Sequence, residues 1–373
     1  VHMSRGLGDV YKRQIKTNSQ KNENCHFFLF IQALKKSSCS TYLTKLFCHS
    51  KNKCFMYTYF FFNITVMMFF IFTTSCQETK NESEKATKVV EVLANKTVET
   101  AKTNNDNLPK APLEKQKYNF PWLTEYADKD MLINRIELPK GYERIEAKNN
   151  SFAEWLRHLP LKKENSDVYL YDNQLKGNQE AHFAVLDIDV GKKDLQQCAD
   201  AVMRLRSEYL YGTKQYETIR FNFTSGDNVP YLRWQAGERP IISGNKVVWK
   251  KQAKKSDTYS NFKAYLQKIF MYAGTFSLEK ELKKAPINDI QAGDVFIKGG
   301  FPGHAVIVLD VAENKVNKDK IFLLAQSYMP AQNIHILVNP NDTETNPWYS
   351  LKNLTEPFDT PEWRFSQENL KRF

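Results

Sequence analysis

The stretch GDVFIKGGFPGHAVIVLD, residues 293–310, decides the fold class of this chain. Its two apolar runs, DVFIK and HAVIVLD, flank a turn rich in Gly and Pro, and this pattern predicts two short antiparallel strands. Because side chains alternate along a strand, His304, Val306, Val308 and Asp310 fall on one face of the second strand. His304 is therefore either a catalytic base or an ordinary polar residue at a strand end.

Two more predicted strands follow this hairpin. The segment KIFLLAQSY, residues 320–328, should pair antiparallel with the strand that begins at His304, and IHILV, residues 334–338, predicts a fourth strand. Counting outward from the loop between the paired strands places His304 opposite residues 326–329. Gln326 would then be positioned to orient the imidazole.

The segments before these strands have helical patterns. SFAEWLRHL, residues 151–159, opens with Ser151 and has Glu154 three residues later, which is the pattern of a capping box at the start of a helix. DLQQCADAVMRLRSEYLYG, residues 194–212, predicts a longer helix with Asp194 as its N-cap.

Two further segments complete the expected fold. Residues 260–284 keep the apolar spacing of a second long helix. Residues 167–172 and 181–190 flank a polar segment and predict a β-hairpin. Helices followed by a small antiparallel sheet define the α+β class, and residues 118–373 are enough for one such domain.

The first 117 residues differ from this domain in composition. Residues 1–55 have no apolar period and are expected to be non-native sequence or an upstream leader. Residues 56–76 are an apolar run that follows lysines and ends in small residues before Cys76, which predicts a secretion signal. Residues 77–117 are rich in Lys, Glu, Thr and Asn and predict a disordered tether.

The cysteine at the end of the apolar run resembles the lipobox of bacterial lipoproteins, which implies that Cys76 is acylated. The alternative is a membrane-spanning helix, because the run approaches the ~20 residues that a bilayer crossing needs. The expected location is the cell envelope, at the periplasmic or outer-membrane face, with acyl chains on Cys76 holding the protein to the membrane.

Most of the positive charge lies in the leader. The whole chain has a formal net charge of +11, but residues 1–76 hold 10 basic and 2 acidic residues, so the remainder carries only about +3. A net charge this small does not indicate binding to nucleic acid, which requires a strongly basic surface. The expected substrate is instead peptide-like or peptidoglycan-like material.

Cys198 is the single cysteine that remains once residues 1–55 and Cys76 are set aside. It lies four residues after the expected cap Asp194, and the N-terminus of a helix favours a thiolate. A nucleophilic cysteine also needs a base and a third group that holds the base. Cys198, His304 and Gln326 supply these three groups in chain order.

This order of motifs resembles the papain-like superfamily, in particular its NlpC-type and CHAP-type bacterial branches. Gly293-Asp294 before VFI and Gly303-His304 before AVIVLD match the strand signatures of those branches. The resemblance covers a core of about residues 190–340. It implies Cys198 as the nucleophile, His304 as the base and Gln326 as the orienting residue.

The sequence departs from those branches in three ways, one of which is a longer gap between Cys198 and Gly293. Gln196 and Gln197 precede the cysteine, and Gln326 stands where His, Asn or Asp is usual. The expected oxyanion donor is the backbone N–H of Cys198, assisted by Gln196 or Gln197.

A second resemblance covers the whole domain. The segments LQQCADAVMRLRSEYLY, FNFTSG, PGHAVIVLDVA, LLAQSYMPAQNIHIL and NPWY are similar to the bacterial lipoprotein family called domain of unknown function 4846. That resemblance implies lipoprotein status and one continuous domain, without an established activity.

Structural roles are the alternative for each candidate. Cys198 falls at helical spacing with apolar neighbours and is equally suited to a small core position, and His304 to a satisfied strand end. Tyr231 and Trp234 either form an aromatic platform for a glycan or peptide or pack in the core, and Tyr328 is grouped with them as a binding residue. Neither metal-ligand spacing nor a phosphate loop occurs, so no cofactor is expected.

Two functions therefore stand as hypotheses. The leading one is a lipid-anchored cysteine peptidase or amidase that acts on envelope peptide or amide substrates. The second is a non-catalytic envelope lipoprotein that binds glycan or peptide at the same residues.

Overall fold

The domain is built around strand β9 (His304–Asn314) in this computed structural model, which describes residues 118–244 and 246–373. Strand β9 pairs antiparallel with β8 (Val295–Lys298) on one side and with β10 (Lys320–Gln326) on the other. Strand β11 (His335–Leu337) pairs with the far edge of β10, so the four strands predicted for this part of the chain are confirmed.

The complete sheet has the order β2-β11-β10-β9-β8-β15-β7, with β1 added beside β9 and β12 beside β10. The additional strands are β1 (Tyr142–Arg144), β2 (His182–Val185), β7 (Lys283–Lys284), β12 (Tyr349–Ser350) and β15 (Leu370–Arg372). The mixed helix and antiparallel sheet confirm the α+β class. The sheet is larger than expected, because it takes strands from residues 142–185, from residues 283–284 and from the C-terminal region of the chain.

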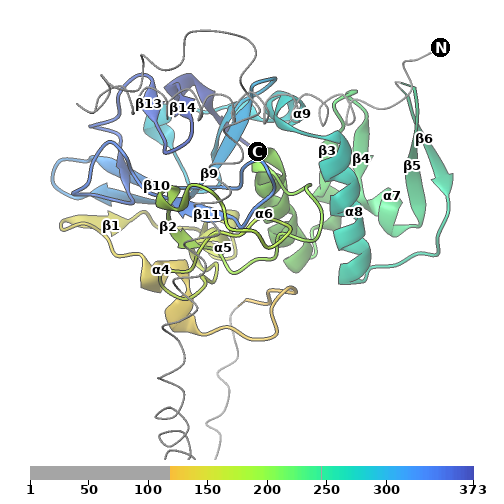
Figure 1. Cartoon of the computed structure of the whole chain (residues 1–373), viewed down its shortest axis with the longest axis horizontal. Helices are drawn as coiled ribbons and strands as arrows, with labels where there is room; N and C mark the ends of the chain where they lie inside the picture. Colours follow the sequence, from red (N-terminus) through yellow and green to blue (C-terminus); the bar gives the residue numbers. More distant parts are fainter. Residues whose placement is uncertain (1–117, 245) are drawn as a thin grey trace, which may run out of the picture. The chain divides into compact units, whose positions relative to one another are not determined.

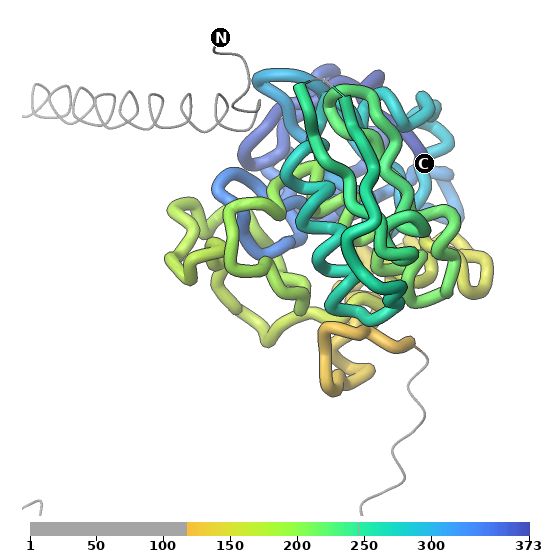
Figure 2. Tube along the Cα trace, turned by 90° about the vertical axis from the view of Figure 1, so that its right-hand side faces the viewer, coloured from red at the N-terminus to blue at the C-terminus, as the bar shows by residue number. Residues whose placement is uncertain are grey.

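Helices and smaller hairpins surround this sheet. The helices are α4 (Leu132–Arg135), α5 (Phe152–Arg157), α6 (Cys198–Gly212), α7 (Tyr231–Gln235), α8 (Tyr259–Tyr272) and α9 (Thr275–Glu281). Short 3-10 helices lie at Asp128–Asp130, Gln179–Ala181, Tyr216–Thr218, Ile287–Asp289 and Gln367–Asn369. The two-stranded pairs are β3 (Arg220–Asn222) with β4 (Asn228–Pro230), β5 (Glu238–Ser243) with β6 (Lys246–Lys251), and β13 (Phe358–Asp359) with β14 (Arg364–Phe365). The β5–β6 hairpin lies beside α7 and α8 in Figure 1 and faces the viewer in Figure 2.

Helix α5 begins as its capping pattern predicts. The Oγ of Ser151 accepts the backbone N–H of Glu154 at 3.2 Å, and the Glu154 carboxylate accepts the N–H of Asn150 at 2.5 Å. The Ser151 half of the capping box is therefore formed, while Glu154 bonds the residue before the N-cap in place of the Ser151 N–H.

Two local predictions are wrong. The predicted hairpin of residues 167–172 and 181–190 does not form, because β2 pairs with β11 of the main sheet instead. The predicted helix over residues 260–284 is two helices, since the backbone is extended at Gly274, where the N–H bonds the Oγ of Ser277 at the start of α9. Glycine has a low helix propensity, and the Ser277 hydroxyl offers its N–H another partner.

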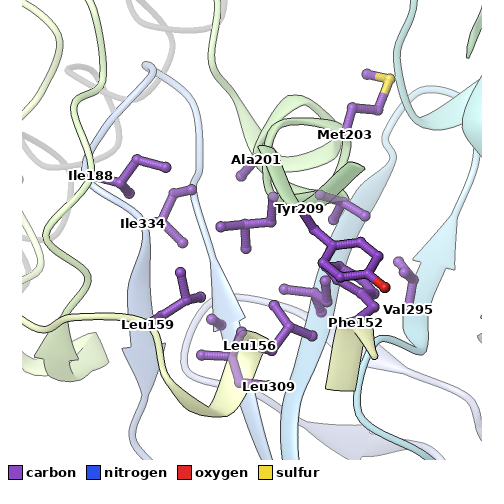
Figure 3. Close-up of a cluster of buried hydrophobic side chains, with 14 of the residues drawn as sticks. Phe152, Leu156, Leu159, Ile188, Ala201, Met203, Tyr209, Val295, Leu309 and Ile334 are labelled. Carbon is purple, nitrogen blue, oxygen red and sulfur yellow. The ribbon is translucent and has the colours of Figure 1, made fainter. Parts of the chain in front are cut away.

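Strand β9 separates two hydrophobic clusters. Ala305, Ile307 and Leu309 belong to the larger cluster, which lies between the sheet and helices α5 and α6 (Figure 3). Val306 and Val308 belong to a second cluster on the opposite face. The twofold alternation read from the sequence is therefore present from residue 304 to residue 309.

A β-bulge changes this alternation at Asp310. Leu323 of β10 pairs with Asp310 and Leu324 pairs with Val308, so Leu309 is an extra residue in β9. Asp310 is fully buried and makes 2.7 Å ion pairs with Arg157 of α5 and Arg144 of β1. The prediction that Asp310 shares a face with His304 is wrong, because the bulge turns its carboxylate toward α5.

The Gly293-Asp294 motif has a structural role. Gly293 has φ +98°, and a Cβ at this position would come within 2.8 Å of the Phe152 ring, so glycine is required there. Asp294 is buried, and its two carboxylate oxygens accept hydrogen bonds from Arg372 of β15 at 2.6 and 2.8 Å. This pair joins β8 to the C-terminal strand.

Within residues 118–244 and 246–373, none of the helices combines the length and the apolarity that crossing a membrane requires. The predicted leader, signal segment, Cys76 and tether lie outside the described residues.

Replacing Asp310 by Ala should lower the free energy of unfolding by about 3–5 kcal/mol, because it leaves the Arg157 guanidinium buried without its partner. Urea unfolding followed by circular dichroism measures the loss. The control is Asp359→Asn, which removes a carboxylate from an exposed pair with Arg364 and should change stability far less. Equal losses in the two variants would contradict the structural role of Asp310.

Candidate functional site

Cys198 is the first residue of helix α6. Gln197 is the N-cap, and its backbone N–H donates to the Asp200 carboxylate at 3.1 Å in a capping box. The prediction of Asp194 as N-cap is wrong, because its carboxylate accepts hydrogen bonds from the Gln197 side chain and from the N–H of Ala331. The helix therefore starts closer to the cysteine than expected.

The Cys198 side chain is buried, with 7% of its surface exposed. Burial, and then the neighbouring Asp200, raise the pKa of the Cys198 thiol to about 12. The backbone N–H groups of Ala199, Ala305 and Cys198 itself act in the opposite direction and do not outweigh the burial. The N–H groups at the helix start favour the thiolate as expected, but desolvation of the sulfur is the larger effect and keeps the thiol neutral.

His304 opens strand β9 and is almost completely buried. Its Nε2 lies 2.7 Å from the carbonyl oxygen of the Gln326 side chain, an arrangement in which the ring N–H donates. Burial lowers the pKa of His304 to about 4, against a smaller raising effect of that hydrogen bond. At neutral pH the imidazole is uncharged and able to accept a proton.

Three aromatic rings surround this imidazole. The ring centroids of Tyr328, Trp363 and Phe365 lie 4.8, 5.3 and 5.9 Å from that of His304. Burial is the main cause that raises the pKa of Tyr328. Tyr328 therefore lies at the candidate site, where it was expected as a binding residue.

No direct hydrogen bond joins the described side chains of Cys198 and His304, and the two residues are connected through the backbone. The link is the backbone N–H of Ala305, the residue after His304, which acts on the Cys198 sulfur. A further link runs from the Oγ of Ser327, the residue after Gln326, to the carbonyl oxygen of Gln196 at 2.8 Å. The starts of α6 and β9 and the end of β10 thus meet at one place.

The side chain of Gln196 is already used within the fold. Its amide accepts a 2.8 Å hydrogen bond from Arg204 and donates to the backbone oxygen of Asp189. Gln196 is buried and its amide is bonded within the fold, which disfavours it as the assisting oxyanion donor. One N–H of the Gln197 amide donates to Asp194. The backbone N–H groups of the first turn of α6 are further donors.

The predicted aromatic platform is also wrong. Tyr231 is completely buried and Trp234 is 7% exposed, and both belong to the main hydrophobic cluster. Tyr231 packs against Phe262 and Tyr265 of α8, at ring-centroid distances of 5.6 and 5.2 Å. Core packing, which was the alternative for these residues, accounts for them.

Sequence reasoning missed Glu362 and Lys176. The Glu362 carboxylate accepts the amide of Gln326 at 2.7 Å and pairs with the Lys176 ammonium at 2.6 Å. Glu362 lies in the turn between β13 and β14, and Lys176 lies in the loop before β2. No motif connects such distant positions. Among the described residues, no three His, Cys, Asp or Glu side chains gather in a way that would hold a metal ion.

Acid should destabilise the domain through its buried histidines. Burial lowers the pKa of His304 to about 4 and that of His335 to about 3, below the ordinary value of 6.5 in the unfolded chain. The unfolded chain binds protons first as the pH falls, so the stabilisation present above pH 6.5 is lost progressively toward those lower values.

Urea unfolding at pH 7.0, 6.0 and 5.0 measures this dependence, at a limit of ~1.4 kcal/mol per pH unit for each histidine. His335→Gln should flatten the profile. A free energy of unfolding that stays constant between pH 7 and pH 5 would contradict the burial of neutral imidazoles.

Comparison with known proteins gives one match. Residues 132–372 match the family described as domain of unknown function 4846. No curated protein and no solved structure matches the chain. The matched segment contains Cys198, His304, Gln326, Glu362 and Lys176 and spans well over half of the sequence. The chain therefore belongs to the family of domain of unknown function 4846.

Proposed function

We propose that this protein is a cysteine hydrolase of papain-like type, with Cys198 as nucleophile, His304 as base and Gln326 as the residue that orients the base. The observation that carries the proposal is the 2.7 Å hydrogen bond between His304 and Gln326. The backbone N–H of Ala305, the residue after His304, bonds the sulfur of a cysteine at the first position of a helix. A nucleophile, a base and an orienting group are the three parts that such catalysis needs.

The papain-like assignment is supported by the order of these parts. The cysteine begins α6, the histidine begins β9, and the orienting amide ends the adjacent strand β10. The additional strands β1, β2, β12 and β15 extend the sheet and leave this arrangement unchanged.

The pKa values of the Cys198 thiol and the His304 imidazole determine which protonation states enter the first step. Because the pKa of the thiol is raised to about 12 and that of the imidazole is lowered to about 4, both groups are neutral at rest. Cys198 therefore attacks the amide carbonyl while its proton passes to Nδ1 of His304, without a thiolate being formed beforehand.

The later steps use the same groups. The oxyanion of the tetrahedral intermediate accepts hydrogen bonds from the backbone N–H groups of the first turn of α6. Collapse of the intermediate breaks the C–N bond, His304 returns its proton to the leaving amine, and a thioester remains on Cys198. Water, deprotonated by His304, then attacks the thioester and the C–S bond breaks. The carboxylic acid leaves, and His304 returns the proton to the Cys198 sulfur.

The substrate class proposed is peptide or amide material of the cell envelope, such as peptidoglycan stem peptides. The support is the sequence pattern before the domain, in which an apolar segment ends at Cys76 and a polar segment of residues 77–117 follows. An acyl anchor on Cys76 would hold the domain at the membrane surface, within reach of such material.

One observation favours a second candidate, a non-catalytic domain that binds glycan or peptide. The Cys198 thiol is buried and its pKa is raised, which are the properties of a structural cysteine. In that case Tyr328 and Trp363, which flank His304, would form the binding surface.

Cys198→Ala should reduce the hydrolysis of peptidoglycan fragments that carry stem peptides by about 10⁴-fold or more, because the nucleophile is removed. Chromatography of the released amines measures turnover, and equilibrium dialysis measures binding, which should persist. Thr213→Ala, at the exposed far end of α6, is the control and should hydrolyse normally. Undiminished turnover in Cys198→Ala would contradict the role of Cys198 as the nucleophile.

Alkylation by iodoacetamide separates the two candidate functions. In the folded protein, His304→Ala should slow the reaction at Cys198, since the proposed base that receives the thiol proton is lost. Mass spectrometry of the Cys198 peptide follows this residue separately from the other cysteines. If Cys198 reacts only after unfolding, and equally in both proteins, the binding function is favoured.

A further inference from the structure

A chain of polar contacts runs outward from His304. His304 Nε2 and the Gln326 carbonyl oxygen are 2.7 Å apart, and the Gln326 amide nitrogen lies 2.7 Å from Oε2 of Glu362. The other carboxylate oxygen of Glu362 lies 2.6 Å from the Lys176 ammonium. Lys176 is held in turn by the backbone oxygen of Asn178 at 2.8 Å.

This chain of contacts is shielded from water. The side chains of Lys176 and Glu362 are only 6% and 15% exposed, and Gln326 and His304 are each 1% exposed. Hydrogen bonds to charged groups gain strength under such conditions, because water does not compete for them.

The charge on Glu362 fixes which way the Gln326 amide faces. A carboxylate has acceptors only, so the group 2.7 Å from it has to be the NH₂ of the amide. The reversed amide would place its carbonyl oxygen against the carboxylate, and two acceptors repel each other. The carbonyl oxygen of Gln326 therefore faces His304.

A second acceptor supports the same orientation. Nε2 of His335 lies 3.4 Å from the Gln326 amide nitrogen, while Nδ1 of His335 lies 2.9 Å from the backbone oxygen of Asn333. That oxygen accepts only, so the His335 proton is on Nδ1 and its Nε2 is an acceptor. Both N–H groups of the Gln326 amide thus point away from His304.

We propose that Glu362, held by Lys176, is a positioning residue that selects the tautomer of His304. Because the carbonyl oxygen of Gln326 accepts only, the His304 proton is on Nε2, and Nδ1 keeps the lone pair that a base requires. The inference deepens the proposed function and rests on it for its consequence at Cys198, while the tautomer itself is measurable without any activity.

The test is ¹⁵N NMR of the full-length protein labelled at histidine, with His304→Gln used to assign the His304 signals. The imidazole nitrogen shifts show which nitrogen carries the proton. The wild-type protein should have the proton on Nε2. In Glu362→Gln the new amide offers both a donor and an acceptor, so Gln326 is no longer fixed and a mixture of tautomers should appear.

Three further variants sharpen the comparison. Asp359→Asn removes a carboxylate from the preceding strand, where it pairs with Arg364, and should leave the tautomer unchanged. Glu362→Asp keeps the charge and should restore the Nε2 proton in part. Lys176→Met combined with Glu362→Gln avoids an unpaired buried ammonium, so it tests the same point if the single variant fails to fold.

Alkylation of Cys198 by iodoacetamide gives the functional consequence. Its rate in Glu362→Gln should fall by roughly tenfold, less than the ~10⁴-fold effect known for changing a group that itself orients a catalytic histidine. A proton on Nδ1 in the wild-type protein, or an unchanged tautomer in both Glu362→Gln and the double variant, overturns the inference. A changed tautomer with unchanged alkylation supports the positioning role of Glu362 and counts against the proposed nucleophile instead.

Discussion

Burial of β9 on both faces is the constraint on which the rest of the structure depends. Residues 304–312 are all buried, and the two polar side chains among them are His304 and Asp310. A buried polar group without a partner is costly, so each has to be satisfied from elsewhere in the chain. Arg157 and Arg144 bring α5 and β1 to Asp310, and Gln326 meets His304 at the end of β10. The positions of these elements thus follow from two side chains of one strand.

Features that depend on neighbouring residues could be predicted from the sequence. The Ser151–Glu154 cap, the end of α6 at Gly212 and the four strands from β8 to β11 arise from local patterns. The contact between His304 and Gln326 could also be predicted from the sequence, because a short loop between β9 and β10 constrains how these consecutive strands pair. Register within a hairpin is the one tertiary relation that a local pattern determines well.

Features that depend on distant residues could not be predicted. The pairing of β2 with β11, the burial of Tyr231 and the contact between Glu362 and Gln326 each join segments that no motif relates. The thiol of Cys198 illustrates the same limit in its chemistry. Its place in the sequence indicates a helix N-terminus, which favours the charged form, but the burial that favours the neutral form is set by the whole fold.

Strand β15 has a consequence for the order in which the domain folds. Its Arg372 neutralises Asp294 of the β8 region, 78 residues earlier, and its backbone covers the edge of β8. During synthesis, β8 to β11 therefore leave the ribosome before the strand that closes the sheet exists. In that interval β8 has an open edge and Asp294 has no counter-charge. Such a nascent chain is exposed to edge-to-edge pairing with other chains, and its final folding step waits for a contact between distant segments.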